Sequence, residues 1–286
     1  MATLQNKIDF AIVFRVTHAN PNGDPLNGNR PRTDYGGFGE VTDVCIKRKI
    51  RDRLLESGAP IFVQSDDRRT DEYRSLAERA RATLGEKLGG PETAKLACAT
   101  WFDVRTFGQL FAIKAAKKTA KKDKATTTDS DGDTGISIGI RGPVSIQSAF
   151  SLAPVDVTST QITKSVSGEG DGSKRGSDTM GMKHRVDHGV YVCYGSMNPQ
   201  LAVRTGFSDA DAETLKAIFP RLFENDASSA RPEGSMAVTK VFWWQHNCKA
   251  GQYSSARVHQ TLHVEPDGSY SLASLDGLTA ETIEGF

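Results

Sequence analysis

The highest local density of cationic side chains lies in residues 47–53, KRKIRDR, which hold five bases and one acid. Like charges one helical turn apart repel each other, at a cost of roughly a few tenths of a kcal/mol per pair. The phosphates of a nucleic acid would relieve this repulsion and suit the forked guanidinium group of arginine. The stretch therefore favours phosphate binding, with a charged helix face that simply contacts water as the alternative.

Four of the six histidines form two HxxxH pairs, His184 with His188 and His259 with His263. Neither pair has the glutamate that a HExxH metalloprotease uses as its base, and we expect the second pair on the surface of a strand. His184 lies in the polar stretch MKHR, which we expect to be flexible. There its imidazole could act as a general acid or base in RNA cleavage. No second catalytic group is visible nearby, so cleavage is the minority hypothesis.

Three aspartates, Asp129, Asp131 and Asp133, resemble the start of a calcium-binding loop. The sixth position of that loop would be Thr134, where a glycine is required. The twelfth would be Ile140, where a bidentate glutamate is required. Calcium binding is therefore disfavoured.

The cysteines and glycines form no cofactor motif. The four cysteines lie roughly fifty residues apart or more and contain no CxxC pair, which disfavours a zinc site and disulfides. The glycine-rich stretch GEGDGSKRG fits neither a phosphate-binding loop nor a dinucleotide-binding fingerprint. We therefore expect no metal and no cofactor.

The chain has 286 residues, with 36 lysines and arginines against 35 aspartates and glutamates, a net charge of +1. Binding to nucleic acid by bulk positive charge alone is thereby disfavoured. Hydrophobic residues make up 37% of the chain, yet no apolar run approaches the roughly 18 residues of a membrane helix. The start, MATLQNKIDF, does not resemble a secretory signal. We expect a single globular domain, residues 1–286, without a membrane contact, in the cytoplasm.

The charges are unevenly distributed along the chain. Residues 114–124 carry six lysines, whereas the last 22 residues, from Glu265, contain five acids and no base. A molecule with a basic and an acidic end suits contact between copies in a head-to-tail arrangement, as well as contact with a polyanion.

Hydrophobic spacing predicts the elements that carry these groups. Residues 8–16 alternate as in a strand, and the turn-rich ANPNGDP ends it. Thr42 is placed to cap a helix whose apolar residues recur at every fourth position up to Leu54. The basic stretch therefore lies on a helix close after the first strand. A second helix fits Thr70 to Leu88.

Patterns downstream complete the set: strands at 136–150, 190–194 and 236–245, and a helix from Ser208 that bends at Pro220. Residues 58–134 interrupt the order as an insertion, and residues 115–134, which lack apolar side chains larger than alanine, are predicted to be mobile. Without the insertion the order is strand, helix, strand, strand, helix, strand. This is the order of an α+β fold of the ferredoxin-like or RNA-recognition type.

Several segments in this order together resemble one protein family. They are NPNGDP, TDVCIKRKIRD, DVRTFGQLFA, SIGIRGPVSIQ, SDTMGMKHRVDHGVYVCYGSMNP and RPEGSMAVTKVFWW. Their sequence and order are similar to the Cas-seven backbone subunit of CRISPR surveillance complexes (Cascade), a member of the RAMP superfamily, and specifically to its type I-C (Csd-two) form.

This resemblance implies an RNA-recognition-like palm with large insertions and a β-hairpin thumb at residues 155–187. It implies that copies assemble head to tail along a guide crRNA and hold a target DNA strand that pairs with it, as in other RNA-guided systems. The other partners would be the Cas-five, Cas-eight and small subunits of Cascade. The chain would be a scaffold and not an enzyme. A metal-independent RNA-processing endonuclease that uses His184 is the alternative.

The resemblance also assigns candidate RNA-binding residues. The main candidates are Asn20, Asn22 and Asn27 in the first loop and Lys47, Arg48 and Arg51 on the first helix. Arg105 and Arg141 are secondary candidates, and a buried ion pair with Asp103 is an equally good account of Arg105. The candidates in the thumb are Lys164, Met180, Lys183 and His184.

Overall fold

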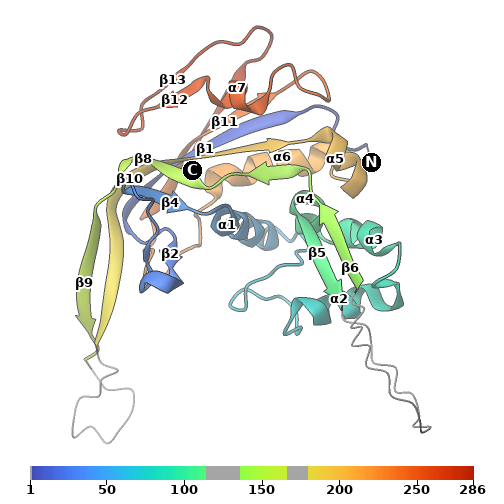
Figure 1. Ribbon diagram of the computed structural model, residues 1–286, viewed down its shortest axis with the longest axis horizontal. Coiled ribbons are helices and arrows are strands. Elements are labelled where there is room, and N and C mark those ends of the chain that lie inside the picture. The colour runs from blue at the N-terminus through green and yellow to red at the C-terminus, as the bar shows by residue number, and fades with distance from the viewer. Residues whose placement is uncertain (1, 114–135, 166–179) are drawn as a thin grey trace, which may run out of the picture.

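The computed structural model of the protein describes residues 2–113, 136–165 and 180–286. The stretch predicted to be mobile (115–134), the aspartates of the calcium-like motif and the glycine-rich GEGDGSKRG lie outside these residues. The centre of the molecule is one antiparallel sheet, and the fold is of the mixed α+β class that the sequence predicts (Figure 1).

Six strands follow one another across the sheet in the order β14, β11, β1, β10, β8, β4, and every pairing among them is antiparallel. Two further strands, β7 and β9, also pair with β10. The strands are β1 (Ile8–Ala19), β4 (Phe38–Val41), β7 (Val144–Ile146), β8 (Ala149–Pro154), β9 (Val157–Thr163), β10 (Met180–Met197), β11 (Met236–Gln245) and β14 (Ala280–Glu284).

Both faces of the sheet are covered, and its central strand is buried almost throughout. On one face, Phe10 and Phe14 of β1 belong to the larger core, which lies between the sheet and the helices α1 (Asp43–Glu56) and α6 (Asp209–Ile218). On the other face, Ala11 and Val13 belong to a smaller core with residues of α7 (Ser255–His259) and β12 (Leu262–Val264), which pairs with β13 (Tyr270–Leu272). This two-sided burial explains why β1 has apolar residues on both of its faces, with Phe10 and Phe14 toward the larger core.

The two helices beneath the sheet begin at polar caps that the sequence predicts. The side chain of Thr42 accepts a hydrogen bond from the backbone N–H of Cys45 at the start of α1. Ser208 and Asp211 form a reciprocal capping box at the start of α6. The predicted bend of this helix at Pro220 is wrong. The helix α6 ends at Ile218, and the proline lies in a 3-10 turn, η4 (Phe219–Arg221).

Two other helix and strand predictions need correction. The helix predicted from Thr70 to Leu88 is shorter: α2 spans Leu76–Leu84, capped by Ser75, and the 3-10 turn η2 (Gly85–Lys87) follows. His259 ends α7 and does not lie on a strand, although His263 does lie on β12. The helix α5 (Pro199–Thr205) follows β10 directly.

Part of the predicted insertion forms a helical lobe, which we define as residues 58–113 and 136–141. It contains α2, η2, α3 (Thr93–Thr100), α4 (Phe102–Phe107) and the hairpin of β5 (Gly108–Ile113) with β6 (Ile136–Arg141). The strand predicted at 136–150 is therefore divided: β6 belongs to the lobe, whereas β7 and β8 join the central sheet. Gly142 permits this division, because a Cβ atom there would lie 2.3 Å from the carbonyl oxygen of Thr106.

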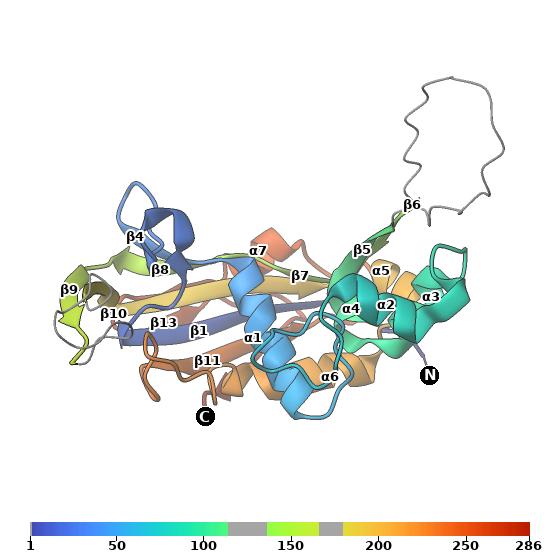
Figure 2. The same cartoon turned by 90° about the horizontal axis from the view of Figure 1, so that it is seen from below.

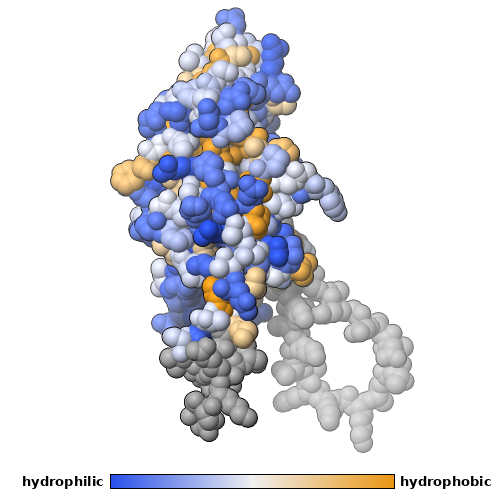
Figure 3. Space-filling model, turned by 90° about the vertical axis from the view of Figure 1, so that its left-hand side faces the viewer, coloured by the Kyte–Doolittle hydropathy of each residue, from blue (hydrophilic) through white to orange (hydrophobic). Residues whose placement is uncertain are grey.

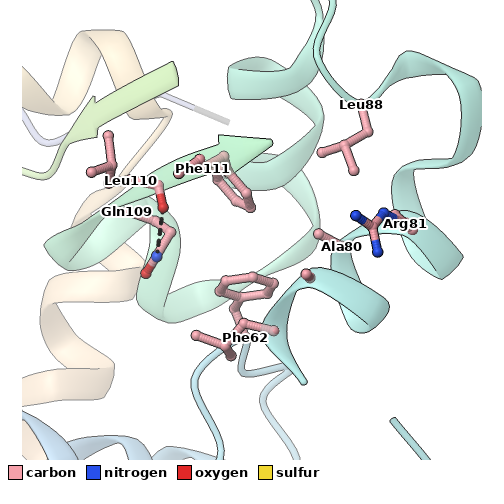
Figure 4. A pocket seen from close by; sticks show the side chains of 10 residues that line it. Phe62, Ala80, Arg81, Leu88, Gln109, Leu110 and Phe111 are labelled. Carbon is pink, nitrogen blue, oxygen red and sulfur yellow. Dashed lines mark hydrogen bonds between the residues drawn. The ribbon is translucent and has the colours of Figure 1, made fainter. Parts of the chain in front are cut away.

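The lobe has an apolar core of its own, in which Phe62, Trp101 and Phe111 pack together. An adjoining apolar pocket of about 220 Å³ lies between α2 and β5, and among the described residues Arg81 is the one charged residue in its lining (Figure 4). The pocket is too apolar to suggest acid-base chemistry.

A long hairpin, which we call the arm, is formed by β9 and residues 180–186 of β10, with Val157 opposite Val186 and Thr163 opposite Met180. It extends a strand that the sequence predicts only at 190–194. The loop between β1 and α1 contains β2 (Gly23–Asp24), the 3-10 turn η1 (Pro25–Asn27), β3 (Arg30–Pro31) and β4.

Candidate nucleic-acid interface

The elements predicted to bind RNA lie on one side of the sheet. In Figures 1 and 2 the arm and the helical lobe project from the same side, at opposite ends of the molecule, and α1 and the β2–η1–β3 loop lie between them. The candidate residues of all three sequence regions are therefore brought to one side of the molecule.

The asparagines of the first loop differ in their surroundings. The side-chain oxygen of Asn22 accepts hydrogen bonds from the backbone N–H and the hydroxyl of Thr42, both at 2.9 Å, and so ties the loop to the start of α1. Asn20 is buried and donates to the carbonyl of Asn29 at 2.7 Å. Asn27 is exposed at the end of η1. Two of the three asparagines thus shape the loop, and Asn27 presents its amide to solvent.

The basic stretch of α1 is neutralised by carboxylates of the same chain. The ion pairs are Lys47 with Asp43, Arg48 with Asp52 and Asp67, Lys49 with Asp226, Arg51 with Asp103, and Arg53 with Glu56. The premise that this helix needs an external anion to relieve repulsion is therefore wrong. Phosphate contact by its residues stays a prediction that must rest on their exposure.

Exposure divides these cations into two groups. Arg48 leaves 47% of its side chain accessible and Lys47 leaves 24%, whereas Lys49 leaves 4%. Burial lowers the pKa of Lys49, and the nearby carboxylate of Asp226 opposes that effect. Lys47 and Arg48 can face a ligand, and Lys49 serves the protein core.

Arg51 belongs to a buried junction between α1 and the helical lobe. Its Nε lies 2.9 Å from Oδ2 of Asp103, whose side chain also accepts hydrogen bonds from the backbone N–H groups of Phe62 and Val63 at 2.7 and 3.1 Å. The guanidinium group of Arg51 also lies 5.1 Å from the ring centroid of Phe107. Three different donors converge on Asp103, so Arg51 helps to hold the lobe on α1.

The two secondary arginines lie in different environments. Arg105 pairs with Asp211 and not with Asp103, and its Nη2 lies 2.8 Å from Oδ1 of that residue. Its guanidinium group also stacks over Phe102 at 4.5 Å. Arg141 is exposed at the end of β6, and no ion pair of Arg141 is found within the described residues.

The strand pairing gives the arm two chemically different faces, since partners across an antiparallel pair lie on the same face. Lys183 faces Thr160 and Arg185 faces Thr158 on one face. The other face carries Met180, Met182 and His184 with Thr163, Gln161 and Ser159. Lys164 is exposed immediately after β9. The arm therefore offers cations and hydroxyl groups on one face and thioethers on the other.

Apolar side chains are unusually exposed on this arm. Met180 is 66% exposed, Met182 55% and Ile162 49%. Figure 3, viewed from the arm side, shows a mainly hydrophilic surface with separate apolar patches. Exposed thioethers of this kind can pack against nucleobases or against another protein.

The sequence predicted His184 in a flexible segment, and this prediction is wrong. The residue lies on β10 with 8% exposure, and its Nδ1 is 2.8 Å from the Ser159 hydroxyl across the arm. This contact packs the imidazole within the hairpin and leaves it little access to a phosphodiester.

The structure also shows an Asp–His pair that sequence spacing does not reveal. Nε2 of the buried His246 lies 2.9 Å from Oδ2 of Asp9, and its Nδ1 accepts a hydrogen bond from the backbone N–H of Gln252. Burial alone would raise the pKa of Asp9, but hydrogen bonds from His246, Ser255 and Lys7 hold it below its usual value. Both imidazole nitrogens are occupied, so the pair is a structural clamp between β1 and the segment after β11.

Within the described residues, no group of three or more histidine, cysteine, aspartate and glutamate side chains is placed to hold a metal ion. The four cysteines are free thiols, and burial raises the pKa of Cys98 to about 11. Among the same residues, no helix is both long and apolar enough to cross a membrane.

Sequence reasoning missed two candidate cations. Arg30 is exposed on β3, next to the first loop, and Arg185 lies on the cationic face of the arm beside Lys183. The signal for Arg185 was present, because period-two alternation from Met180 onward puts residues 183 and 185 on the same face.

The model of the family described as CRISPR-associated protein Cas7 matches residues 6–280. The chain belongs to this family. A relative from Haloferax volcanii, itself described as CRISPR-associated protein Cas7, is 28% identical over 291 residues, which cover 99% of this chain and 82% of the relative.

Two solved structures are also similar to this Cas7-family chain. One is described as a pre-nicking CRISPR RNA-guided surveillance complex, with a TM-score of 0.46, 16% identity, and coverage of 83% of this chain and 75% of the other. The second is described as a CRISPR RNA-guided surveillance complex, with a TM-score of 0.44, 18% identity, and coverage of 95% and 77%.

Proposed function

We propose that this Cas7-family chain is a non-catalytic scaffold that binds a guide crRNA in a CRISPR RNA-guided surveillance complex of the type I-C form. Several copies bind the guide in succession and support its pairing with a target DNA strand, together with Cas-five, Cas-eight and small subunits. The observation that carries the proposal is the family match over residues 6–280.

The arrangement of the sheet supports an RNA-recognition-like palm. β11, β1, β10 and β8 lie side by side, with α1 between β1 and β8 in the sequence and α6 between β10 and β11. In the strand, helix, strand, strand, helix, strand order, these are the fourth, first, third and second strands of a ferredoxin-like unit. In this proposal the helical lobe is an insertion into the palm, and the arm is the described part of the thumb at 155–187.

The exposed polar groups supply the proposed phosphate contacts. Asn27 and Arg30 in the first loop and Lys47 and Arg48 on α1 present donors on one side of the palm. Side-chain amides, ammonium groups and guanidinium groups all donate to phosphate oxygens. Asn20, Asn22 and Arg51 act indirectly, because their bonds fix the shape of the loop and the position of α1.

The arm supplies a second set of contacts. Lys164, Lys183 and Arg185 approach phosphates, while Met180 and Met182 pack against bases that are separated from their neighbours. His184 holds the two strands of the hairpin together through Ser159. Arg105 is a secondary contact, because it already pairs with Asp211. Arg141, exposed at the end of β6, is the other secondary contact.

A salt titration of RNA binding tests the proposal. We expect the double variant Lys47→Ala, Arg48→Ala to reduce the slope of log affinity against log salt by about 0.7 for each phosphate of a single strand that the variant no longer neutralises. Arg81→Ala with Lys87→Ala, on the helical lobe, is the matched control and should leave the slope unchanged. An unchanged slope in the first variant contradicts the assignment of these residues.

The purified wild-type protein also allows a test that distinguishes a scaffold from an endonuclease. We expect bound RNA to co-purify, to stay intact without metal, and to capture complementary DNA. Metal-independent cleavage of repeat RNA that is abolished in His184→Ala would overturn the scaffold function in favour of RNA processing.

A further inference from the structure

A large cavity with both charged and apolar lining residues lies where the helical lobe meets the end of the sheet. It has a volume of about 780 Å³ and is lined by residues of α3, α5 and the start of α6. In the part of the chain that the structure describes, its charged lining residues are three cations, Lys95, Arg105 and Arg204, against one carboxylate, Asp211. Cavities of this size at junctions between structural units commonly bind ligands.

The lining is arranged to accept a negatively charged group. Asp211 already neutralises Arg105 at 2.8 Å, whereas Lys95 and Arg204 are exposed and have no ion pair within the described residues. Two exposed cations without an ion pair among these residues are complementary to a carboxylate.

The rim of the cavity also has an apolar component. Val203 is 62% exposed on α5 and lies next to Arg204 in the sequence. A ligand that matches the cavity therefore combines carboxylates with a compact apolar group, which favours a peptide segment over the repeated phosphates of a nucleic acid.

The turn between β12 and β13 has this composition. Its residues Glu265, Pro266 and Asp267 are all exposed. The backbone N–H of Glu265 donates to the Ser269 carbonyl at 2.8 Å, and the N–H of Gly268 donates to the Glu265 carbonyl at 2.8 Å. The Asp267 side chain accepts from the Ser269 N–H at 2.8 Å. The turn thus presents two carboxylates on either side of a proline in a fixed shape, which limits the entropy cost of binding.

The turn and the cavity lie on opposite sides of the molecule. In both Figures 1 and 2 β13 is on the side of the arm, and α3 and α5 are on the other side. We propose that the cavity between α3 and α5 binds the acidic turn 265–269 of a second copy of this chain. Glu265 and Asp267 of one copy then approach Lys95 and Arg204 of the next, and Pro266 packs on Val203.

Such a contact joins two different surfaces, so it repeats from copy to copy without closing into a dimer. One turn in one cavity is a small interface, and it is accordingly weak on its own. The contact does not require RNA, so it can be tested without the proposed guide. Its failure would leave the RNA-binding proposal intact.

Carbodiimide cross-linking of a mixture of unlabelled and ¹⁵N-labelled protein tests the contact, since it couples a lysine amine to a carboxylate that touches it. We expect a mixed-isotope cross-link between Lys95 and Glu265 or Asp267. A wild-type protein in which Lys95 forms no cross-link between copies, or forms one only with another carboxylate, overturns the proposal.

Charge reversal provides the specific test. One variant carries Lys95→Glu and Arg204→Glu, and the other carries Glu265→Lys and Asp267→Lys. Each alone should reduce the yield of cross-linked dimer at least about tenfold, because like charges then meet and, in the first variant, the Lys95 amine that forms the amide bond is absent. A mixture of the two should recover it through the introduced carboxylates and amines. Failure to recover in the mixture, with both variants folded, contradicts the pairing.

Two controls make the test specific. Arg81→Glu with Lys87→Glu changes the charge of the same lobe by the same amount away from the cavity, and it should cross-link like the wild type. Glu265→Lys alone leaves in place the hydrogen bond between the Asp267 side chain and Ser269. It should still reduce the yield of cross-linked dimer, which shows that the reduction in the double variant does not come from a disturbed turn.

Discussion

At the scale of single residues, the cations of α1 perform two tasks that their sequence does not distinguish. Arg51 and Arg48 are three residues apart on one helix, yet Arg51 leaves 13% of its side chain exposed and Arg48 leaves 47%. Asp103, the partner of Arg51, is itself 1% exposed. Asp52, the partner of Arg48, is also buried, at 7% exposure, but a second cation, Arg68, lies 4.0 Å from it, and Arg48 itself is half exposed. Loss of Arg51 therefore removes more of the neutralising charge than loss of Arg48.

We accordingly predict that Arg51→Ala destabilises the protein by about 3 kcal/mol, because it leaves the Asp103 carboxylate buried without its cation. Arg48→Ala is the matched control on the same helix and should cost less than about 1 kcal/mol. Denaturant unfolding of the RNA-free protein measures both values. Equal, small decreases in the two variants would show that Asp103 does not depend on Arg51.

The exposure of these residues could not be predicted from the run KRKIRDR. The carboxylates that pair with Lys49 and Arg51 lie 177 and 52 residues away in the sequence. Local charge density indicates that anions must be near, but only the tertiary fold shows that the protein supplies them. For the same reason the sequence suggested the neighbouring Asp103 as the alternative ion-pair partner of Arg105, whereas the partner in the structure is Asp211, 106 residues away.

The Asp9 clamp gives a prediction that depends on pH. The pKa of Asp9 is lowered in the folded protein relative to its usual value of 3.8. Its charge therefore stabilises the fold above the unfolded-state pKa, and this stabilisation is lost as the pH falls through the folded-state pKa.

Asp9→Asn should reduce the free energy of unfolding by about 2 kcal/mol at neutral pH, since His246 and Lys7 lose a charged acceptor. The difference from the wild type should narrow as the pH falls below the usual pKa of 3.8, where Asp9 of the unfolded chain takes up a proton. It should be smallest below the lowered pKa of the folded protein, where the wild-type Asp9 is also neutral. Unfolding curves at several pH values measure it. Asp276→Asn, at an exposed position, is the control, and a difference that stays constant down to acid pH would contradict this account.

At the scale of elements, period and capping predicted the parts that are buried against one another. Residues 8–16, the helix after Thr42 and the strand at 236–245 all appear in the structure, because burial imposes a spacing on each of them. The helix α5 was missed although Asn198, Pro199 and Gly206 supply its cap, first turn and end. Its short length gave no periodic signal.

Pairing partners were less predictable than the elements. Residues 136–150 show one alternating pattern, yet β6 pairs with β5 in the helical lobe while β7 and β8 pair with β10. Alternation describes a strand, but it does not specify the sheet to which the strand belongs.

The two faces of the arm lead to a prediction at this scale. In the proposed function the thioethers of Met180 and Met182 contact bases, whereas Lys183 and Arg185 contact phosphates. Met180→Ala with Met182→Ala should retain the salt slope of RNA binding and reduce the unstacking of the guide. Lys183→Ala with Arg185→Ala should reduce the salt slope of RNA binding and retain the unstacking of the guide.

Fluorescence of 2-aminopurine placed along a bound RNA measures unstacking, since the fluorophore brightens when it leaves its neighbours. We expect periodic bright positions with the wild type and at least about a twofold decrease in their intensity with the methionine variant. If the methionine variant keeps the pattern and the cation variant abolishes it at saturating protein, the assignment of the two faces is wrong.

At the scale of the whole molecule, a net charge of +1 is compatible with binding a polyanion because the charges are spatially divided. Exposed cations lie on the first loop, α1 and the arm, on one side of the sheet. Part of the acidic end is used within the chain, since Glu281 and Glu284 pair with Lys216 and Lys240. The carboxylates of Glu265 and Asp267 in the turn at 265–269 contact His263 and Ser269, and both residues are still exposed to other molecules.

This division predicts how copies assemble. Without RNA the protein should be monomeric or polydisperse, because the contact between turn and cavity is small and each copy exposes both halves of it. A long single-stranded RNA holds neighbouring copies close, so each weak contact then forms at a high effective concentration. The contact does not close on itself, and the product should be an open array whose mass grows in proportion to the length of the RNA. Light scattering across a series of RNA lengths measures this growth, and one closed dimer of the same mass with and without RNA would contradict it.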